Sequence, residues 1–112
     1  MLAFELNEIQ RQHQAAGQLW QEFLRVPALS MGLYVLPPGG SDPQQPHTED
    51  EIYYVVGGRG QIRVAAEDRA VQSGSIVYVA AHVAHRFHSI EEELQVVVFF
   101  APAEGTGDGS RE

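Results

Sequence analysis

The side chains best suited to chemistry gather in the middle of the sequence, where four of the five histidines lie between positions 47 and 88. His47 and Glu51 stand four residues apart, and Gln45 shares their parity, so on one strand all three side chains would point to the same face. Imidazole nitrogen and carboxylate oxygen are ligands that first-row divalent metals accept. This segment is therefore a candidate metal-binding strand.

A later histidine, His85, begins another run of strand-forming residues. A closed antiparallel barrel would bring inward-facing residues of such distant strands to one point. A face of two histidines and one carboxylate leaves coordination positions open for water or substrate. Because this spacing also arises by chance, the residues alone leave open whether His47, Glu51 and His85 bind a metal.

The composition narrows the available chemistry. The 112 residues contain neither Cys nor Lys, which excludes a thiolate nucleophile, Cys-ligated zinc, a disulfide framework and a lysine Schiff base. Fifteen acidic residues against seven arginines give a net charge of −8, which argues against a nucleic-acid-binding surface. No apolar run approaches the roughly 18 residues of a membrane span, and the N-terminus does not resemble a signal peptide. We expect a cytoplasmic protein with no nucleic-acid and no membrane partner.

The hydrophobic pattern predicts one helix followed by strands. From Asn7 to about Leu24, large and apolar residues recur every three to four positions, as on one face of a helix. Pro27 prevents the helix from continuing further. After Pro27 come six or seven short runs rich in β-branched and aromatic residues. No crossover helices separate these runs, so the sheets must be antiparallel and must close or stack. The predicted fold class is all-β, an antiparallel β-barrel or jelly roll with one N-terminal helix.

The chain is expected to form one domain. An N-terminal strand and helix would occupy residues 1–26, a single barrel residues 27–103, and a disordered tail residues 104–112, which offer almost nothing to bury. Between two apolar strands, Glu91, Glu92 and Glu93 predict a solvated turn.

Two segments resemble the paired motifs of the cupin superfamily. The first family motif, G-x5-H-x-H-x3-4-E-x6-G, corresponds to Gly39 or Gly40 near its start, Gln45 in place of the first His, His47, Glu51 and Gly58. The second, G-x5-P-x-G-x2-H-x3-N, corresponds to Gly74, Ala80, His82, His85 and Ser89. The resemblance covers about residues 29–102 and implies a cupin-type barrel of the small single-domain "cupin 2 conserved barrel" kind.

The resemblance also implies one divalent transition metal, Fe, Mn, Ni or Zn, bound by Gln45, His47, Glu51 and His85. Family sites typically use three His and one Glu, and the oxygen of Gln45 is a weaker ligand than the imidazole it replaces. Glu49 shares the strand parity and is an alternative ligand, unless it lies solvated in a turn or bulge. The three retained ligands argue against a metal-free barrel, where unpaired interior polar groups would cost free energy.

Three functions fit these expectations. The first is a mononuclear-metal enzyme, dioxygenase-like or isomerase-like, that acts on a small oxygen-rich molecule, with no catalytic residue assigned beyond the ligands. The second is a non-catalytic barrel that binds or senses a small molecule or a metal. The third is a storage or oligomerisation role, which the retained ligand set disfavours.

The remaining histidines have structural interpretations. His13 and Trp20 are expected to dock the helix on the barrel, His82 to lie in a surface turn, and His88 to point outward from its strand. Because small cupins commonly pair, we expect a homodimer that uses the N-terminal residues 3–6 or the apolar residues 96–100.

Overall fold

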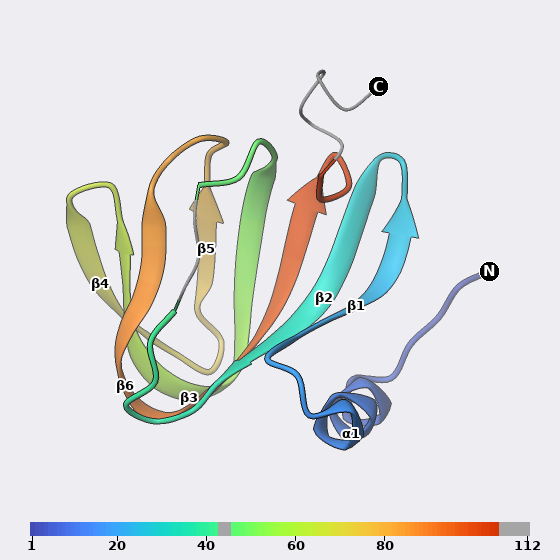
Figure 1. The fold of residues 1–112 in the computed structure, drawn as a ribbon, viewed down its shortest axis with the longest axis horizontal. Coiled ribbons are helices and arrows are strands. Elements are labelled where there is room, and N and C mark those ends of the chain that lie inside the picture. The colour runs from blue at the N-terminus through green and yellow to red at the C-terminus, as the bar shows by residue number, and fades with distance from the viewer. Residues whose placement is uncertain (43–45, 106–112) are drawn as a thin grey trace.

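The computed structural model describes residues 1–42 and 46–105, which form mostly antiparallel sheet (Figure 1). Within these residues one helix, α1 (Leu6–Ala16), precedes six strands. The strands are β1 (Trp20–Val26), β2 (Leu29–Leu36), β3 (Asp50–Val64), β4 (Glu67–Gln72), β5 (Ile76–Val79) and β6 (His85–Ala101). The predicted all-β fold with one N-terminal helix is confirmed.

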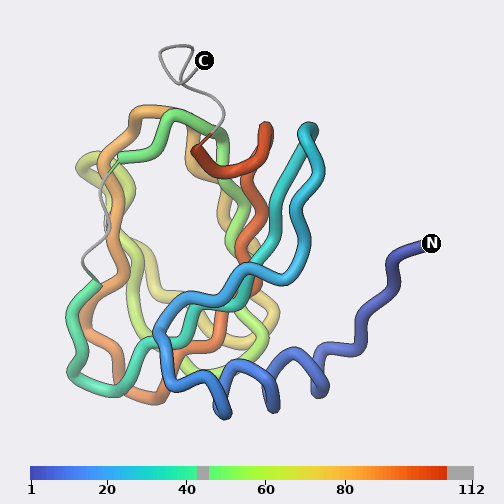
Figure 2. The backbone as a smooth tube through the Cα atoms, turned by 45° about the vertical axis from the view of Figure 1, so that its right-hand side comes forward, coloured from blue at the N-terminus to red at the C-terminus, as the bar shows by residue number. Residues whose placement is uncertain are grey.

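The last strand, β6, lies in the middle of the sheet. The strand order is β1-β2-β6-β3-β4, and β5 pairs with β3 outside this path. All the pairings are antiparallel. Figure 2 shows the strands curving around a common interior, with α1 outside it.

The two longest strands, β3 and β6, bend together at one place. Their register shifts in steps between Val55 and Gln61, which is typical of bulges that bend a strand. At this point Gly58 has a φ of 82°, and a Cβ atom there would overlap the backbone of Glu93. Glu91–Glu93 are exposed, as predicted, but the predicted turn is wrong, because these residues continue β6 through the bend.

The helix is shorter than its hydrophobic pattern predicts. Gly17 adopts a left-handed φ of 70°, and its N–H donates to the carbonyl of His13, which closes α1. Residues 20–24, expected to continue the helix, instead lie in β1, which pairs with β2. The ring of Trp20 lies edge-on to Tyr34 and Phe100, and this barrel packing outweighs the local helical spacing.

Apolar side chains pack on both faces of the curved sheet. The interior cluster includes the buried residues Tyr34, Leu36, Tyr53, Val55, Phe87, Leu94 and Phe100. A second cluster on the outer face joins Ile9 of α1 to Leu33 and Val97. The docking role expected of His13 is consistent with its burial and with its Nε2 lying 2.8 Å from the carbonyl oxygen of Leu19. In the part of the chain that the structure describes, no helix has the length and apolar character needed to cross a membrane.

Candidate metal centre

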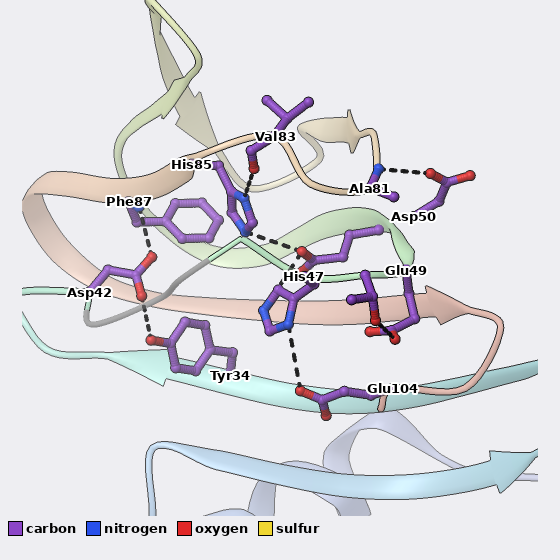
Figure 3. Close-up of polar contacts among 12 residues, drawn as sticks. Tyr34, Asp42, His47, Glu49, Asp50, Ala81, Val83, His85, Phe87 and Glu104 are labelled. Atoms are coloured by element: carbon purple, nitrogen blue, oxygen red, sulfur yellow. Dashed lines mark hydrogen bonds and ion pairs between the residues drawn. The ribbon is translucent and has the colours of Figure 1, made fainter. Parts of the chain in front are cut away.

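Three of the four predicted ligands converge inside the barrel (Figure 3). His47 lies in the loop before β3, Glu51 near the start of β3 and His85 at the start of β6. Their ligand atoms all lie within 4.8 Å of one another. Oε1 of Glu51 is the shared point, 3.1 Å from Nε2 of His85 and 3.8 Å from Nε2 of His47.

This convergence depends on closure of the barrel. His85 pairs with Val64 at the far end of β3, whereas Glu51 pairs with Phe100. The side chains of His85 and Glu51 therefore meet across the interior and not as cross-strand neighbours. Both side chains point into the barrel, as the alternation of side chains along a strand requires. Each is buried, whereas the residues next to it on its strand are exposed.

The orientation of the His85 ring follows from its second nitrogen. Nδ1 lies 2.8 Å from the carbonyl oxygen of Val83, which can only accept a hydrogen bond, so Nδ1 carries a proton. In the neutral ring, Nε2 then presents a lone pair toward the Glu51 carboxylate. Two electron-rich atoms at 3.1 Å repel each other unless a proton or a metal ion lies between them.

The pKa of His85 reflects the same arrangement. Burial lowers this pKa, but the hydrogen bonds to Glu51 and to the Val83 carbonyl, together with the charges of Glu51 and Asp42, raise it above its ordinary value. The contacts with Glu51 and Val83 and the nearby charges therefore favour the positively charged form of His85 despite its burial.

The second oxygen of Glu51 also fits the role of a metal ligand. Only 1% of the Glu51 residue surface is exposed, and among the described residues Oε2 is buried with no hydrogen-bond partner. A buried carboxylate oxygen without a partner is costly, whereas a metal ion would satisfy it. The donor set of two imidazoles and a carboxylate thus fits a first-row divalent metal.

Polar and aromatic contacts hold the loop and walls around these ligands. Asp42, itself buried, accepts hydrogen bonds from the hydroxyl of Tyr34 at 2.6 Å and from the backbone N–H of Phe87 at 2.8 Å. Burial, followed by this contact with Asp42, raises the pKa of Tyr34 far above its ordinary value. The rings of Phe100 and Tyr53 lie 5.0 Å from His47 and 5.9 Å from His85 between ring centroids.

Comparison with known proteins agrees with this architecture. The family model for the cupin domain matches residues 32–102. The chain belongs to the cupin family.

The sequence and the fold each have relatives. An uncharacterized protein of Streptomyces coelicolor, SCO3923, is 47% identical over 104 residues, which cover 93% of this cupin and 99% of that protein. Among solved structures, TT1209 from Thermus thermophilus has a TM-score of 0.71 and 19% identity, with 92% of this chain and 99% of that chain covered. An RmlC-like cupin with a double-stranded β-helix fold from Methanocaldococcus jannaschii has a TM-score of 0.68 and 21% identity, with 74% and 78% covered.

Two further residues, Gln45 and Glu49, were predicted as possible metal ligands of this cupin. Gln45, the expected fourth ligand, lies outside the described residues. Glu49 lies in a bend, as expected, but it is 2% exposed, so its predicted solvation is wrong. One Glu49 oxygen accepts a hydrogen bond from the hydroxyl of Thr48, and Glu49 is not part of the ligand cluster.

The outlying histidines lie where their sequence positions suggest. His82 is exposed in a turn with a φ of 68°, and its backbone N–H donates to the carbonyl of His47 at 2.7 Å. His88 lies on β6 with its Nε2 2.7 Å from a carboxylate oxygen of Asp68, outside the ligand cluster.

One residue near the site was missed. Glu104 was placed in the expected tail, yet one of its carboxylate oxygens lies 4.0 Å from Nδ1 of His47 (Figure 3). No local sequence signal marks this role, because Glu104 stands in a Gly-rich acidic stretch after the last strand.

Proposed function

We propose that this cupin is a mononuclear-metal enzyme, dioxygenase-like or isomerase-like, that acts on a small oxygen-rich molecule. The observation that supports it most is the Glu51 carboxylate, whose Oε1 faces two imidazoles while its buried Oε2 has no hydrogen-bond partner among the described residues. A purely structural role for this acid would leave that oxygen unsatisfied in the barrel interior.

His47, Glu51 and His85 would bind the metal, with Gln45 as the fourth ligand. Their nitrogen and oxygen donors suit Fe, Mn, Ni or Zn, and the absence of Cys from the sequence excludes a thiolate site. A divalent metal bound there supplies Lewis-acid or redox chemistry to oxygen atoms of a substrate.

The chain itself supplies an asymmetric pocket. The side chains of Glu51 and His85 are 1% exposed, whereas that of His47 is 24% exposed. A small molecule would therefore approach on the His47 side. There the ring of Phe100, 5.0 Å from that of His47 between centroids, provides an apolar wall that would limit water and so strengthen electrostatic interactions in the site.

Metal content and oxygen uptake test this function. Protein purified without added metal should contain about one metal ion per chain by elemental analysis, since the chain offers one such cluster among its described residues. The Fe(II)-loaded protein is then supplied with diketones and catechols in an oxygen electrode, and with keto sugars in an isomerisation assay.

The outcomes separate the functions. Turnover of any of these substrates supports the enzyme. Stoichiometric metal without turnover on the whole panel would favour the non-catalytic binding or sensing barrel, and protein that binds no metal would overturn both the site and the enzyme.

A further inference from the structure

The segment that follows β6 folds back onto the barrel. The backbone of Ala103 is fully buried, and its N–H donates to the carbonyl of Pro27 at 3.4 Å. The next residue, Glu104, donates its backbone N–H to the hydroxyl of Ser30 at 2.8 Å, and Ser30 is itself fully buried on β2. Two contacts to the β1–β2 hairpin thus fix the backbone of residues 103–104.

This anchoring places Glu104 beside the candidate metal centre. Its Oε2 lies 4.0 Å from Nδ1 of His47, while Oε1 of Glu51 lies 3.8 Å from Nε2 of the same ring. The His47 ring therefore lies between two carboxylates, one buried in the ligand cluster and one at its rim.

The two histidines of the cluster then share one pattern. In His85, Nδ1 is satisfied by the Val83 carbonyl and Nε2 faces Glu51. In His47, Nδ1 faces Glu104 and Nε2 faces Glu51. Histidines that bind metals almost always donate their other N–H to a carboxylate or carbonyl, which fixes the ring and its tautomer.

We propose that Glu104 is the positioning residue of His47: its carboxylate, 4.0 Å from Nδ1, attracts the Nδ1–H group and so favours the ring orientation and tautomer that turn the Nε2 lone pair toward Glu51 and His85. This role rests on the proposed metal centre. It makes the folded-back segment after β6 a part of the site.

The charges around Glu104 agree with this role. Burial raises the pKa of Glu104, and the nearby carboxylates of Glu22, Glu49 and Glu51 raise it further. Among the groups that shift this pKa, His47 is the one that opposes the shift. Burial and the other carboxylates thus favour the neutral form of Glu104, and the His47 ring is the neighbour that favours its carboxylate form.

Metal affinity and the state of the His47 ring test the proposal. Co²⁺ is titrated into metal-free wild type, Glu104→Ala, Glu104→Gln and the control Glu22→Gln, and its visible absorption is followed. We expect an affinity about 10- to 100-fold weaker for Glu104→Ala, a smaller loss for Glu104→Gln, which keeps a neutral acceptor, and no change for Glu22→Gln. Glu22 is a suitable control because it lies in the same acidic group but bonds to Arg25.

A second measurement does not depend on the metal. The ¹⁵N shifts of the His47 ring in metal-free protein should show the Nδ1–H tautomer in wild type and a larger share of the Nε2–H tautomer in Glu104→Ala. Should Glu104→Ala fail to fold, Glu104→Gln carries both measurements, because it keeps the size of the side chain.

The outcomes distinguish this role from the metal site itself. If wild type binds Co²⁺ but Glu104→Ala and Glu104→Gln bind it equally well with unchanged His47 shifts, the positioning role is overturned and the metal centre stands. Wild type that binds no Co²⁺ overturns the proposed function, and with it the role of Glu104 as a partner of a metal ligand.

Discussion

Nε2 of His85 lies 3.1 Å from Oε1 of Glu51, and both side chains are almost completely buried. Because Nδ1 of His85 donates to Val83, the short distance is favourable only with positive charge between the two groups. A proton on His85 can provide that charge, and a metal ion bound by the proposed ligands would replace the proton.

Removal of a ligand should abolish stabilisation by the metal. At a free metal concentration 100 times Kd, binding should raise the free energy of unfolding of wild type by about 2.7 kcal/mol, and a chelator should reverse the rise. His47→Ala and His85→Ala should show little or no rise in Tm with metal in calorimetry. His88→Ala is the matched control, because His88 contacts Asp68 outside the cluster; equal responses in all four proteins would place the metal elsewhere.

The Trp20 ring packs so closely on Gly32 that we expect this position not to tolerate a larger side chain. An alanine at Gly32 would overlap the Trp20 ring, so Gly32→Ala should lower the free energy of unfolding by about 2 kcal/mol or more. Since Trp20 is the sole tryptophan, its emission should report displacement of the ring. In the control Gly57→Ala, the nearest atom to the new Cβ is 3.8 Å away, and we expect a change below about 1 kcal/mol. Equal costs in urea titrations would contradict this packing.

The Tyr34 hydroxyl should give stability that is lost at high pH. Tyr34→Phe leaves Asp42 without one donor and should cost about 1–3 kcal/mol at pH 7. Burial and Asp42 raise the pKa of Tyr34 above its ordinary value of 10.0, so above pH 10 the unfolded chain loses this proton while the folded protein keeps it.

The sign of this effect follows from proton linkage. Stability from Tyr34 is complete below pH 10 and falls as pH rises, by up to about 1.4 kcal/mol per pH unit. The stability difference between wild type and Tyr34→Phe should therefore shrink between pH 10 and 11 in urea titrations. A difference that stays constant would show that Tyr34 ionises normally in the folded protein.

Much of the barrel could be predicted from alternation and turn residues, but not where each strand ends. The runs on either side of Gly58, and those on either side of Glu91–Glu93, are each one bent strand. Bulges keep pairing intact across Gly and charged residues, so local composition suggests a break that does not exist. Trp20 was misplaced for a related reason, since a short stretch of apolar residues fits a helix or a strand equally well.

The residues of the candidate site also differ in whether nearby sequence could predict them. Glu51 and His85 could be predicted because strand parity and the family motifs both depend on nearby residues. His47 could be predicted from the family motif alone, because it lies in the loop before β3 and not on the strand expected to carry it together with Glu51. Glu104 could not, because it reaches His47 only through the anchor between its backbone and Ser30, 74 residues earlier. The burial of Glu49 was likewise missed, since it follows from the path of the loop before β3.

Homodimerisation stays a prediction, and the structure suggests which face to test. Residues 96–100 are buried or half-buried within the chain, so the surface expected there is already covered. An exposed apolar surface pairs Ile52 with Tyr78 and Tyr54 with Ile76 across β3 and β5.

We expect light scattering to give about twice the chain mass of 12.4 kDa. Substituting both Ile76 and Tyr78 by Lys should give a monomer, whereas Leu2→Lys, on an exposed N-terminal side chain, should not change the mass. A wild-type mass of 12.4 kDa would reject the dimer.

The central place of β6 has a consequence for how the chain acquires its structure. β6 separates β2 from β3, so neither neighbour finds its main partner until residues 85–101 have left the ribosome. Folding of this barrel must then wait for β6, and we expect it to be slow for its size, because its pairings join residues distant in sequence. A nascent chain stalled before His85 would expose the edges of β2 and β3, the stage at which this protein is most open to aggregation and to chaperones.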